Sequence, residues 1–312
     1  MTLQQLKYIV AVDTYKNFAL AAEKCFITQP TLSMQIQKLE NELGVIIFDR
    51  GKKPVLTTPI GQKIVEQARA NLKGFRKIQE IIDEERNEIK GELKIGIIPT
   101  VAPYLLPLFV TKFLRKYPGV HLVIEELLSR QILDKLSRDL LDFGILVTPT
   151  KDSRMFEIPL FYEPFVAYLS KNHPLMKYPA LDLSKLNLSE MLLLSEGHCF
   201  RYQVINICPK REEHLQSTRL QFESGSLETL KRIVEKDIGY TLLPELATLN
   251  LSPRQKRFLR VFRRPQPVRE VSIVIQRSFL KEQLIAVFRK ELLASLPSSL
   301  RRHSGENVVD WT

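Results

Sequence analysis

Apolar residues spaced three and four apart predict three short helices near the start of the chain. Their apolar faces comprise Leu3, Leu6, Ile9 and Val10, then Phe18, Ala21, Ala22 and Cys25, then Leu32, Ile36, Leu39 and Leu43. Thr28 can cap the third helix, Pro30 is tolerated in its first turn, and Gly44 is expected to end it. The stretch from Phe48 to Thr57 predicts two short strands joined by a basic turn.

One long amphipathic helix is predicted from Gln62 to Lys90, a stretch with no proline and a single glycine, Gly74. Its narrow apolar stripe comprises Ile64, Ala68, Leu72, Phe75, Ile78 and Ile82. Such a stripe suits a coiled coil with a second copy of the chain, and packing onto the chain's own body is the alternative. We therefore predict a dimer helix whose contacts include Ala68, Leu72, Phe75 and Ile78.

After Gly91, short apolar runs alternate with helical patterns, which predicts α/β units with mostly parallel sheets. The expected strands are Leu93–Ile98, Val120–Glu125, Phe143–Val147, Phe165–Leu169, Met191–Leu194, Ile238–Leu243 and Val271–Ile275. Residues 301–312 carry little apolar surface, so we expect them to form a disordered tail.

Length and composition are those of an ordinary soluble protein of two or three domains: 312 residues, 44% hydrophobic and 26% charged. The longest apolar runs are too short and too often broken by proline to span a bilayer. Three cysteines in a chain of this size favour a reducing compartment. Because the N-terminal residues lack the pattern of a signal peptide, we expect a cytoplasmic protein with no membrane partner.

The net charge of +11 and the isoelectric point near 9.5 indicate an anionic partner. Basic residues gather at 50–53 and at 254–264, and only the first group lies within a DNA-binding pattern. Two short helices joined by a tight turn are typical of a helix-turn-helix, whose second helix enters the major groove. The candidate DNA-binding residues are Gln29, Pro30, Thr31, Ser33, Gln35 and Lys38 on that helix and Arg50, Lys52 and Lys53 in the basic wing. A small helical bundle with solvated polar faces is the alternative.

The N-terminal sequence resembles the winged helix-turn-helix of LysR-type transcriptional regulators. The resemblance rests on Ala21-Ala22, Gln29-Pro30-Thr31-Leu32-Ser33, Ile36, Leu39-Glu40, Leu43-Gly44, Phe48-Asp49-Arg50, Leu56-Thr57 and Gly61. It implies that Gln29, Pro30, Thr31, Ser33 and Gln35 open the recognition helix. It also implies a transcription factor and not an enzyme. The partners would be a double-stranded DNA operator, RNA polymerase and further copies of the chain, as a homodimer or tetramer.

The same resemblance implies a domain organisation. An N-terminal winged helix-turn-helix, all-α with a small β wing, would occupy 1–58, and a long linker and dimerisation helix 59–90. An α/β regulatory domain similar to periplasmic binding proteins would occupy 91–300. One of its two subdomains would be built from 91–163 and 267–300 and the other from 164–266, with the chain crossing near Glu163 and returning near Pro267.

Two cysteines nine residues apart, Cys199 and Cys208, carry the candidate chemistry. His198 and Arg201 flank Cys199, and nearby cations favour the nucleophilic thiolate. A thiolate that attacks a peroxide becomes a sulfenic acid, which a second thiol condenses to a disulfide. The intervening apolar residues predict a helix about 13 Å long, whereas a disulfide needs Cα atoms within about 7 Å. A disulfide would therefore remodel this segment. The alternative is a pair of inert core cysteines.

Within the LysR family the sequence is similar to the peroxide-sensing members. The similarity is carried by Gly197-His198-Cys199-Phe200-Arg201-Tyr202-Gln203 with Cys208, by Gly96–Pro107 and by Ser226–Leu230. It implies a peroxidatic Cys199, a resolving Cys208, and Thr100 and Ser129 as hydroxyls that bind peroxide or an ordered water. It also implies activation of oxidative-stress defence genes by hydrogen peroxide through a reversible Cys199–Cys208 disulfide.

Three other interpretations use the same residues. A small effector in the cleft between the subdomains, near Thr100, Ser129 and Thr148, would make the cysteines incidental. A thiol peroxidase would turn over peroxide, which the helix-turn-helix argues against. A zinc site from His198, Cys199, Cys208 and His214 has no common spacing, so we expect no metal and no other cofactor.

Overall fold

The computed structural model describes residues 1–85, 88–208, 224–277, 281–300 and 307–311. The chain divides into two compact units, Met1–Glu88 and Ile89–Thr312. His214 lies outside the described residues.

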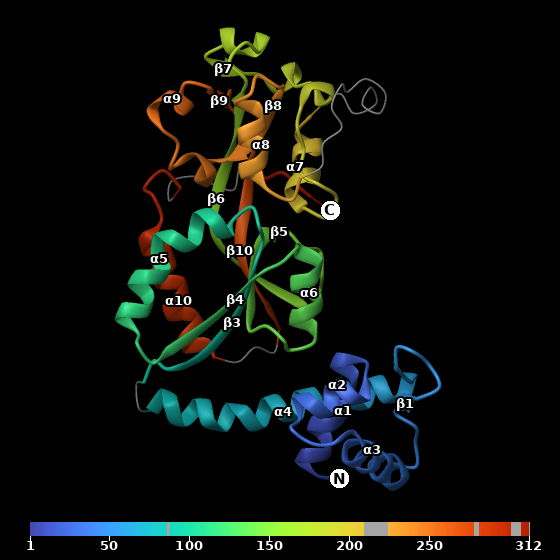
Figure 1. Ribbon diagram of the computed structural model, residues 1–312. Coiled ribbons are helices and arrows are strands. Elements are labelled where there is room, and N and C mark those ends of the chain that lie inside the picture. Colours follow the sequence, from blue (N-terminus) through green and yellow to red (C-terminus); the bar gives the residue numbers. More distant parts are fainter. Residues whose placement is uncertain (86–87, 209–223, 278–280, 301–306, 312) are drawn as a thin grey trace. The chain divides into compact units, whose positions relative to one another are not determined.

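The N-terminal unit is a three-helix bundle with a two-stranded wing (Figure 1). Its elements are α1 (Leu3–Tyr15), α2 (Phe18–Lys24), α3 (Gln29–Leu43), β1 (Phe48–Asp49), β2 (Leu56–Thr57) and α4 (Pro59–Glu85). The side chains of Thr2, Asn17 and Thr28 cap the first three helices by accepting backbone N–H bonds, which offsets donors that a helix start leaves unpaired. Gly44 ends α3 at φ +67°, as predicted.

The apolar stripe of the long helix α4 is buried in its first half and exposed in its second half, which corrects part of the predicted dimer stripe. Ala68 and Leu72 are 2% and 6% exposed and belong to the core that α4 shares with α1, α2 and α3. Phe75 and Ile78, one and two turns further on, are 57% and 58% exposed. The first half of the stripe therefore packs on its own chain, and the surface left for a second copy begins at Phe75. Residues 88–90, which we predicted to be helical, lie outside the helix.

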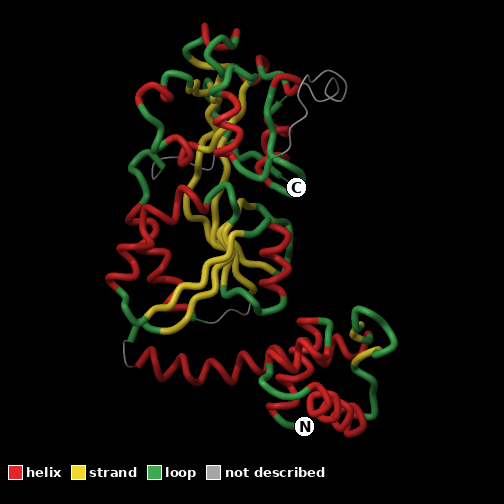
Figure 2. Tube along the Cα trace, viewed as in Figure 1, coloured by secondary structure: helices red, strands yellow, loops and turns green. Residues whose placement is uncertain are grey.

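The second unit is built on one eight-stranded sheet. Its strands are β3 (Gly91–Ile97), β4 (Val120–Glu126), β5 (Phe143–Thr148), β6 (Met155–Leu169), β7 (Ala180–Leu181), β8 (Tyr240–Pro244), β9 (Leu259–Phe262) and β10 (Val268–Gln276). They lie in the order β4-β3-β5-β10-β6-β9-β7, and β8 pairs with β6. Figure 2 shows these strands continuing from one half of the unit into the other.

The sheet is mixed, whereas the alternation of elements predicted mostly parallel pairing. β3 pairs in parallel with β4 and β5, but β10 runs antiparallel to both β5 and β6. The reason is that β6 and β10 are long antiparallel strands through which the chain passes between the two halves. The predicted strand Met191–Leu194 is wrong: only isolated bridges from Met191 to Tyr240 and from Leu194 to Ser224 occur there.

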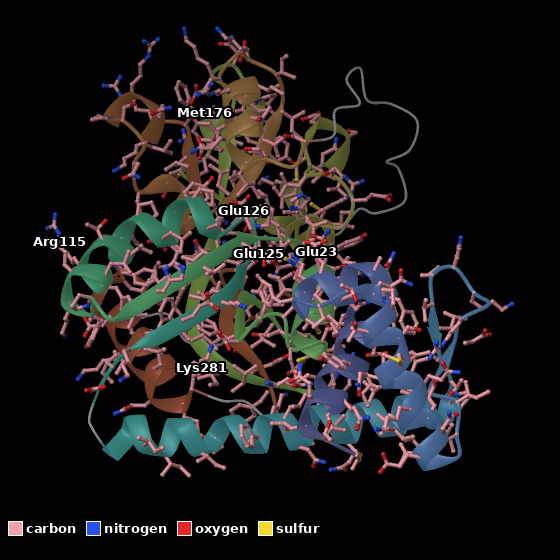
Figure 3. The ribbon with its side chains drawn as sticks, turned by 60° about the horizontal axis from the view of Figure 1, so that its bottom comes forward. Glu23, Arg115, Glu125, Glu126, Met176 and Lys281 are labelled. Carbon is pink, nitrogen blue, oxygen red and sulfur yellow. The ribbon has the colours of Figure 1, made fainter. Side chains whose placement is uncertain are left out.

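Two hydrophobic clusters pack on different parts of the sheet. In the first, α5 (Ala102–Lys116) and α10 (Glu282–Ser295) cover one face and α6 (Ser129–Ser137) the other (Figure 1). Phe109 and Phe113 of α5 and Phe143 of β5 meet the ring of Phe288, with centroids 5.1–5.4 Å apart. Lys281, labelled in Figure 3, ties the start of α10 to β3 and β5 by binding Glu92 O and the Asp142 carboxylate.

The second cluster is covered by shorter helices. They are α7 (Cys199–Ile207), α8 (Leu227–Val234) and α9 (Pro253–Lys256), with 3₁₀ turns at Pro174–Lys177, Leu183–Lys185, Leu188–Glu190 and Glu245–Thr248. The two clusters meet at α7, because Cys199 at its start packs in the first and Cys208 at its end packs in the second. We refer to the parts around the first and second clusters as the first and second subdomains.

The end of the chain corrects the predicted disordered tail. Residues 307–311 are ordered against the second unit, with Val308 bridged to Val268 and the Trp311 indole donating to Val147 O at 3.1 Å. The segment is short and polar in part, so its order depends on contacts with residues far away in the sequence. Residues 301–306 and 312 lie outside the described part of the chain.

Candidate redox site and nucleic-acid interface

Cys199 is the first residue of α7 and is 3% exposed, and Cys208 caps the same helix at 1%. Neither cysteine forms a disulfide. Gly197 turns the chain into the helix at φ +90°, a conformation that a side chain would strain, and a Cβ there would lie 3.1 Å from Leu128. This close approach brings the start of α7 to Ser129, the first residue of α6.

The buried guanidinium of Arg269 lies close enough to the Cys199 thiol to act on it electrostatically. Arg269 of β10 acts electrostatically on Cys199, and its Nη1 donates to Thr100 Oγ1 at 3.0 Å while its Nη2 donates to Thr100 O at 3.1 Å. Glu163 of β6 pairs with the same guanidinium at 2.6 Å, and both side chains are fully buried. Glu163 also accepts from Leu246 N at 2.6 Å, so the carboxylate is held from two sides. The arrangement fixes a positive charge beside a buried thiol.

The Ser129 hydroxyl completes the polar side of the site. It is 2% exposed and lies beside the Cys199 thiol, whose pKa it lowers. Its Oγ makes no fully formed hydrogen bond to any described residue. A buried polar atom without a full partner is costly, and it is suited to bind a small polar molecule or a water. Ser129 therefore lies at the Cys199 thiol, and Thr100 is linked to the site through the Arg269 guanidinium.

Burial raises the pKa of the Cys199 thiol, and the Ser129 hydroxyl and the Arg269 guanidinium act in the opposite direction. Burial is the largest effect because the thiol is fully enclosed and a thiolate there would lose its hydration. The resting group is therefore the neutral thiol, not a preformed thiolate.

A dependence of the reaction on pH follows. We expect the rate of Cys199 oxidation by peroxide to rise about tenfold per pH unit between about pH 6 and about pH 8, because the thiolate fraction rises tenfold per unit below the pKa. Stopped-flow measurement of the rate, in a Cys25→Ser background, checks this. A rate that is flat across this range would mean that the thiol is already ionised.

His198 and Arg201 do not activate the thiol, which corrects our expectation. Burial lowers the pKa of His198, so its imidazole is neutral at pH 7. The Arg201 guanidinium donates to Leu194 O at 2.8 Å and fixes the segment before the helix. The cation that acts on Cys199 is Arg269, from a strand distant in the sequence.

Arg269 and Glu163 were missed by our sequence analysis. The available signal was the charged residue Arg269 within the apolar strand pattern of β10, since a lone charge in a buried strand needs a partner. Nothing in the sequence indicated that this partner would be Glu163 or that the pair would lie beside Cys199.

Thr148, the third residue proposed to surround an effector, is already engaged. Its hydroxyl contacts Glu270 Oε1 at 2.5 Å and Ser272 Oγ at 2.6 Å, and the residue is fully buried. It therefore does not join Thr100 and Ser129 in one site. No group of three or more His, Cys, Asp or Glu side chains suited to a metal ion occurs in the described part of the chain. None of its helices is both long and apolar enough to cross a membrane.

The predicted DNA-binding residues share the surface of α3 and the wing. Gln29, Pro30 and Lys38 are exposed, whereas Thr31, Ser33 and Gln35 are partly buried. Lys52 and Lys53 are exposed at the tip of the wing. These positions are compatible with a helix that enters a groove and a wing that follows the phosphate backbone.

Arg50 has a structural role that the sequence did not reveal. Its guanidinium donates to Ser33 Oγ at 2.8 Å and pairs with Glu40 at 3.0 Å, and it lies 5.0 Å from the ring centroid of Phe18. Glu40 also accepts from the backbone N–H groups of Ile47 and Phe48. Arg50 therefore joins the wing to α3 in the absence of DNA.

The variants Arg50→Ala and Lys53→Ala are accordingly expected to differ. Lys53→Ala should weaken binding to matched and scrambled DNA alike and reduce the salt slope by about one phosphate contact, without changing stability. Arg50→Ala should also lower the melting temperature, because the Glu40 carboxylate loses its partner. Fluorescence anisotropy at several salt concentrations and thermal unfolding separate them, and equal melting temperatures would contradict this assignment.

Comparisons with known proteins match both units. Residues 3–62 match the family of bacterial regulatory helix-turn-helix proteins of the lysR family, and residues 86–297 match the LysR substrate binding domain. A hydrogen peroxide-inducible genes activator from Haemophilus influenzae is 37% identical over 279 residues, 88% of this chain and 90% of that protein.

Solved structures agree with these matches. Full-length OxyR from Pseudomonas aeruginosa, with one cysteine replaced by aspartate, superposes with a TM-score of 0.77 at 37% identity, covering 94% of this chain and 98% of that one. A hydrogen peroxide-bound cysteine mutant of OxyR from Corynebacterium glutamicum gives 0.62 at 29% identity, covering 94% and 92%. The expected fold, a helix-turn-helix domain with a two-part α/β regulatory domain, is confirmed. The chain belongs to the LysR family of bacterial transcriptional regulators, and its relatives there include the OxyR peroxide-inducible activators.

Proposed function

We propose that this regulator senses hydrogen peroxide through Cys199 and Cys208 and thereby controls oxidative-stress defence genes. The observation that carries the proposal is a buried Cys199 thiol on which Ser129 and Arg269 act, with a second reduced cysteine at the other end of the same helix. Relatives named as peroxide-inducible activators, and a peroxide-bound neighbour, support the choice of oxidant.

The chemistry proceeds in two balanced steps. The Cys199 thiolate attacks one oxygen of hydrogen peroxide, an S–O bond forms as the O–O bond breaks, and the departing hydroxide takes a proton to become water. The Ser129 and Thr100 hydroxyls and the Arg269 charge lie where they can orient the peroxide and stabilise the departing oxygen. The Cys208 sulfur then attacks the sulfenic sulfur, so that an S–S bond forms and a second water leaves. Sulfur is oxidised and peroxide is reduced.

Oxidation changes the fold because the two cysteines stand at opposite ends of α7 (Cys199–Ile207). At about 1.5 Å per residue, an intact helix holds their Cα atoms about 13 Å apart, whereas a disulfide needs about 7 Å or less. The helix must therefore open before the bond can close, which gives the chemistry a structural output. This proposal also includes the domain limits predicted from the sequence, RNA polymerase as a partner, and a cytoplasmic location.

The test compares reduced protein with protein treated with one equivalent of peroxide. We expect the loss of two titratable thiols per chain, a transient sulfenic acid that a dimedone-type reagent traps, and a changed footprint on operator DNA. Unchanged thiols and an unchanged footprint would leave gating by a small effector as the better explanation. Sustained reduction of many equivalents of peroxide per chain, with excess dithiothreitol as the reductant, would favour a peroxidase.

We also propose that a second copy packs along the exposed half of α4. Phe75→Asp should give monomers by sedimentation and weaken operator binding about 100-fold, because one half-site per protein loses the gain from linked binding. Ala70→Asp, which adds the same charge at an exposed position on another face of α4, should keep the wild-type mass. Leu72→Asp should instead unfold the N-terminal unit, since it buries a charge in its core. A dimeric Phe75→Asp protein would place the interface elsewhere.

A further inference from the structure

Residues 307–311 form a short segment, here called the C-terminal strap, that lies against β10. Val268 N donates to Asn307 O at 3.2 Å and Val309 N donates to Val268 O at 2.9 Å. Figure 1 shows the chain end next to α7. The strap is therefore held by backbone pairing at the first residue of a strand that crosses between the subdomains.

The strap is also bound by the helix that separates the two cysteines. Gln203 Nε2 donates to Val309 O at 2.9 Å and Asn206 Nδ2 donates to Asp310 O at 2.8 Å. Gln203 is fully buried, and its Oε1 has no partner among the described residues. The hydrogen bond to the Val309 carbonyl therefore offsets part of the cost of burying this amide.

The other end of the strap reaches the first subdomain. The Trp311 indole donates to Val147 O at 3.1 Å, and Asp310 pairs with Lys151 at 2.6 Å. Trp311 packs on the first hydrophobic cluster, whereas Val309 packs on the second. The strap thus connects α7 to the end of β5 across the boundary at which Cys199 lies.

We propose that the C-terminal strap is a latch on α7 that stabilises the dithiol form, with Gln203 and Asn206 as positioning residues for disulfide formation. The inference rests on the proposed function. Both amides lie between Cys199 and Cys208, on the helical turns that must open before the sulfurs can meet. Closing the disulfide therefore breaks the bonds to the strap, and releasing the strap favours the disulfide by the same amount.

The strap would therefore couple the redox state of the cysteines to the first subdomain. When α7 opens, the strap loses its bonds to Gln203 and Asn206, and the contacts of Trp311 with Val147 and of Asp310 with Lys151 lose that support. A change in α7 is then passed to the first subdomain through the C-terminal strap.

Trp311 is the single tryptophan of the chain, so its fluorescence reports the strap directly. In the full-length reduced protein we expect emission and acrylamide quenching of a partly shielded indole. One equivalent of hydrogen peroxide should shift both toward those of a free tryptophan peptide, and dithiothreitol should reverse the change. Cys199→Ser should show no response to peroxide.

A glutathione titration measures the coupling. Deletion of residues 307–312, and the double variant Gln203→Ala with Asn206→Ala, should each favour the disulfide about tenfold, which lowers the midpoint potential by about 30 mV. Alanine has the highest helix propensity, so a weaker α7 cannot produce this direction. Tyr202→Ala, at an exposed position of the same helix, is the matched control and should keep the wild-type potential.

The outcomes separate the strap from the peroxide function. Wild-type potentials in both strap-free proteins, with the disulfide forming normally, would overturn the latch and leave the sensor intact. If no disulfide forms in any of these proteins, the proposed peroxide-sensing function is wrong. The reduced Asn206→Ala protein then still tests whether the strap is bound to α7. Asn206 is exposed, so this variant leaves the core unchanged. Wild-type Trp311 quenching in that variant and in the double variant would overturn the latch.

Discussion

Cys199→Ser is expected to lose all response to hydrogen peroxide, whereas Cys208→Ser should keep the first oxidation step. Only Cys199 lies among the groups that can orient a peroxide, since Ser129 and Arg269 act on its thiol. Cys208 is enclosed in the second hydrophobic cluster, at the other end of α7. The Cys208→Ser protein should therefore stall at a sulfenic acid on Cys199.

Mass spectrometry after labelling with a dimedone-type reagent measures this stalled species. The adduct should appear on Cys199 in Cys208→Ser and be absent from Cys199→Ser. Cys25→Ser, which changes a partly buried cysteine in the N-terminal unit, should behave as the wild type. Labelling of Cys208 in Cys199→Ser at the wild-type rate would reverse the roles of the two cysteines.

Replacement of Arg269 should have the largest effect on stability. Arg269→Ala leaves the Glu163 carboxylate buried without its partner, and breaking a buried pair in this way costs about 3–5 kcal/mol. It also removes the cation that lowers the pKa of the Cys199 thiol and the donor that orients Thr100. We expect a lower midpoint in urea unfolding and slower oxidation of Cys199 in the same protein.

A second substitution separates these two effects. Arg269→Met with Glu163→Leu replaces the buried pair by apolar side chains of similar size, and such replacements are often neutral for stability. The double variant should regain most of the unfolding free energy while its oxidation rate stays low. Recovery of both properties would show that Arg269 acts on the thiol only by maintaining the fold.

Local patterns predicted much of the fold because their causes are local. The cap at Thr28, the end of α3 at Gly44 and the helix between the two cysteines each depend on residues within a few positions of one another. The LysR resemblance added the arrangement of these elements, and it predicted roles for Cys199, Cys208, Thr100 and Ser129.

The predictions were wrong where contacts with residues distant in the sequence determine which side chains are buried. Ala68 and Leu72 follow the same stripe as Phe75, and only their contact with α1 shows that they belong to the core of their own unit. Residues 307–311 looked like a polar tail until their contacts with Val268 and Val147 were known. Periodicity describes which face of an element is apolar, but it does not say what covers that face.

The sequence by itself determined that this chain binds DNA through a helix-turn-helix and carries two cysteines at the ends of one helix. The tertiary structure decided the environment of the reactive thiol. His198 and Arg201 adjoin Cys199 in the sequence, yet burial keeps His198 neutral and Arg201 binds Leu194 O. The charge comes from Arg269, whose position beside the thiol is set by the pairing of β6 and β10. The electrostatic effect on a buried group depends on distance through space and on burial, and neither quantity is encoded by spacing along the chain.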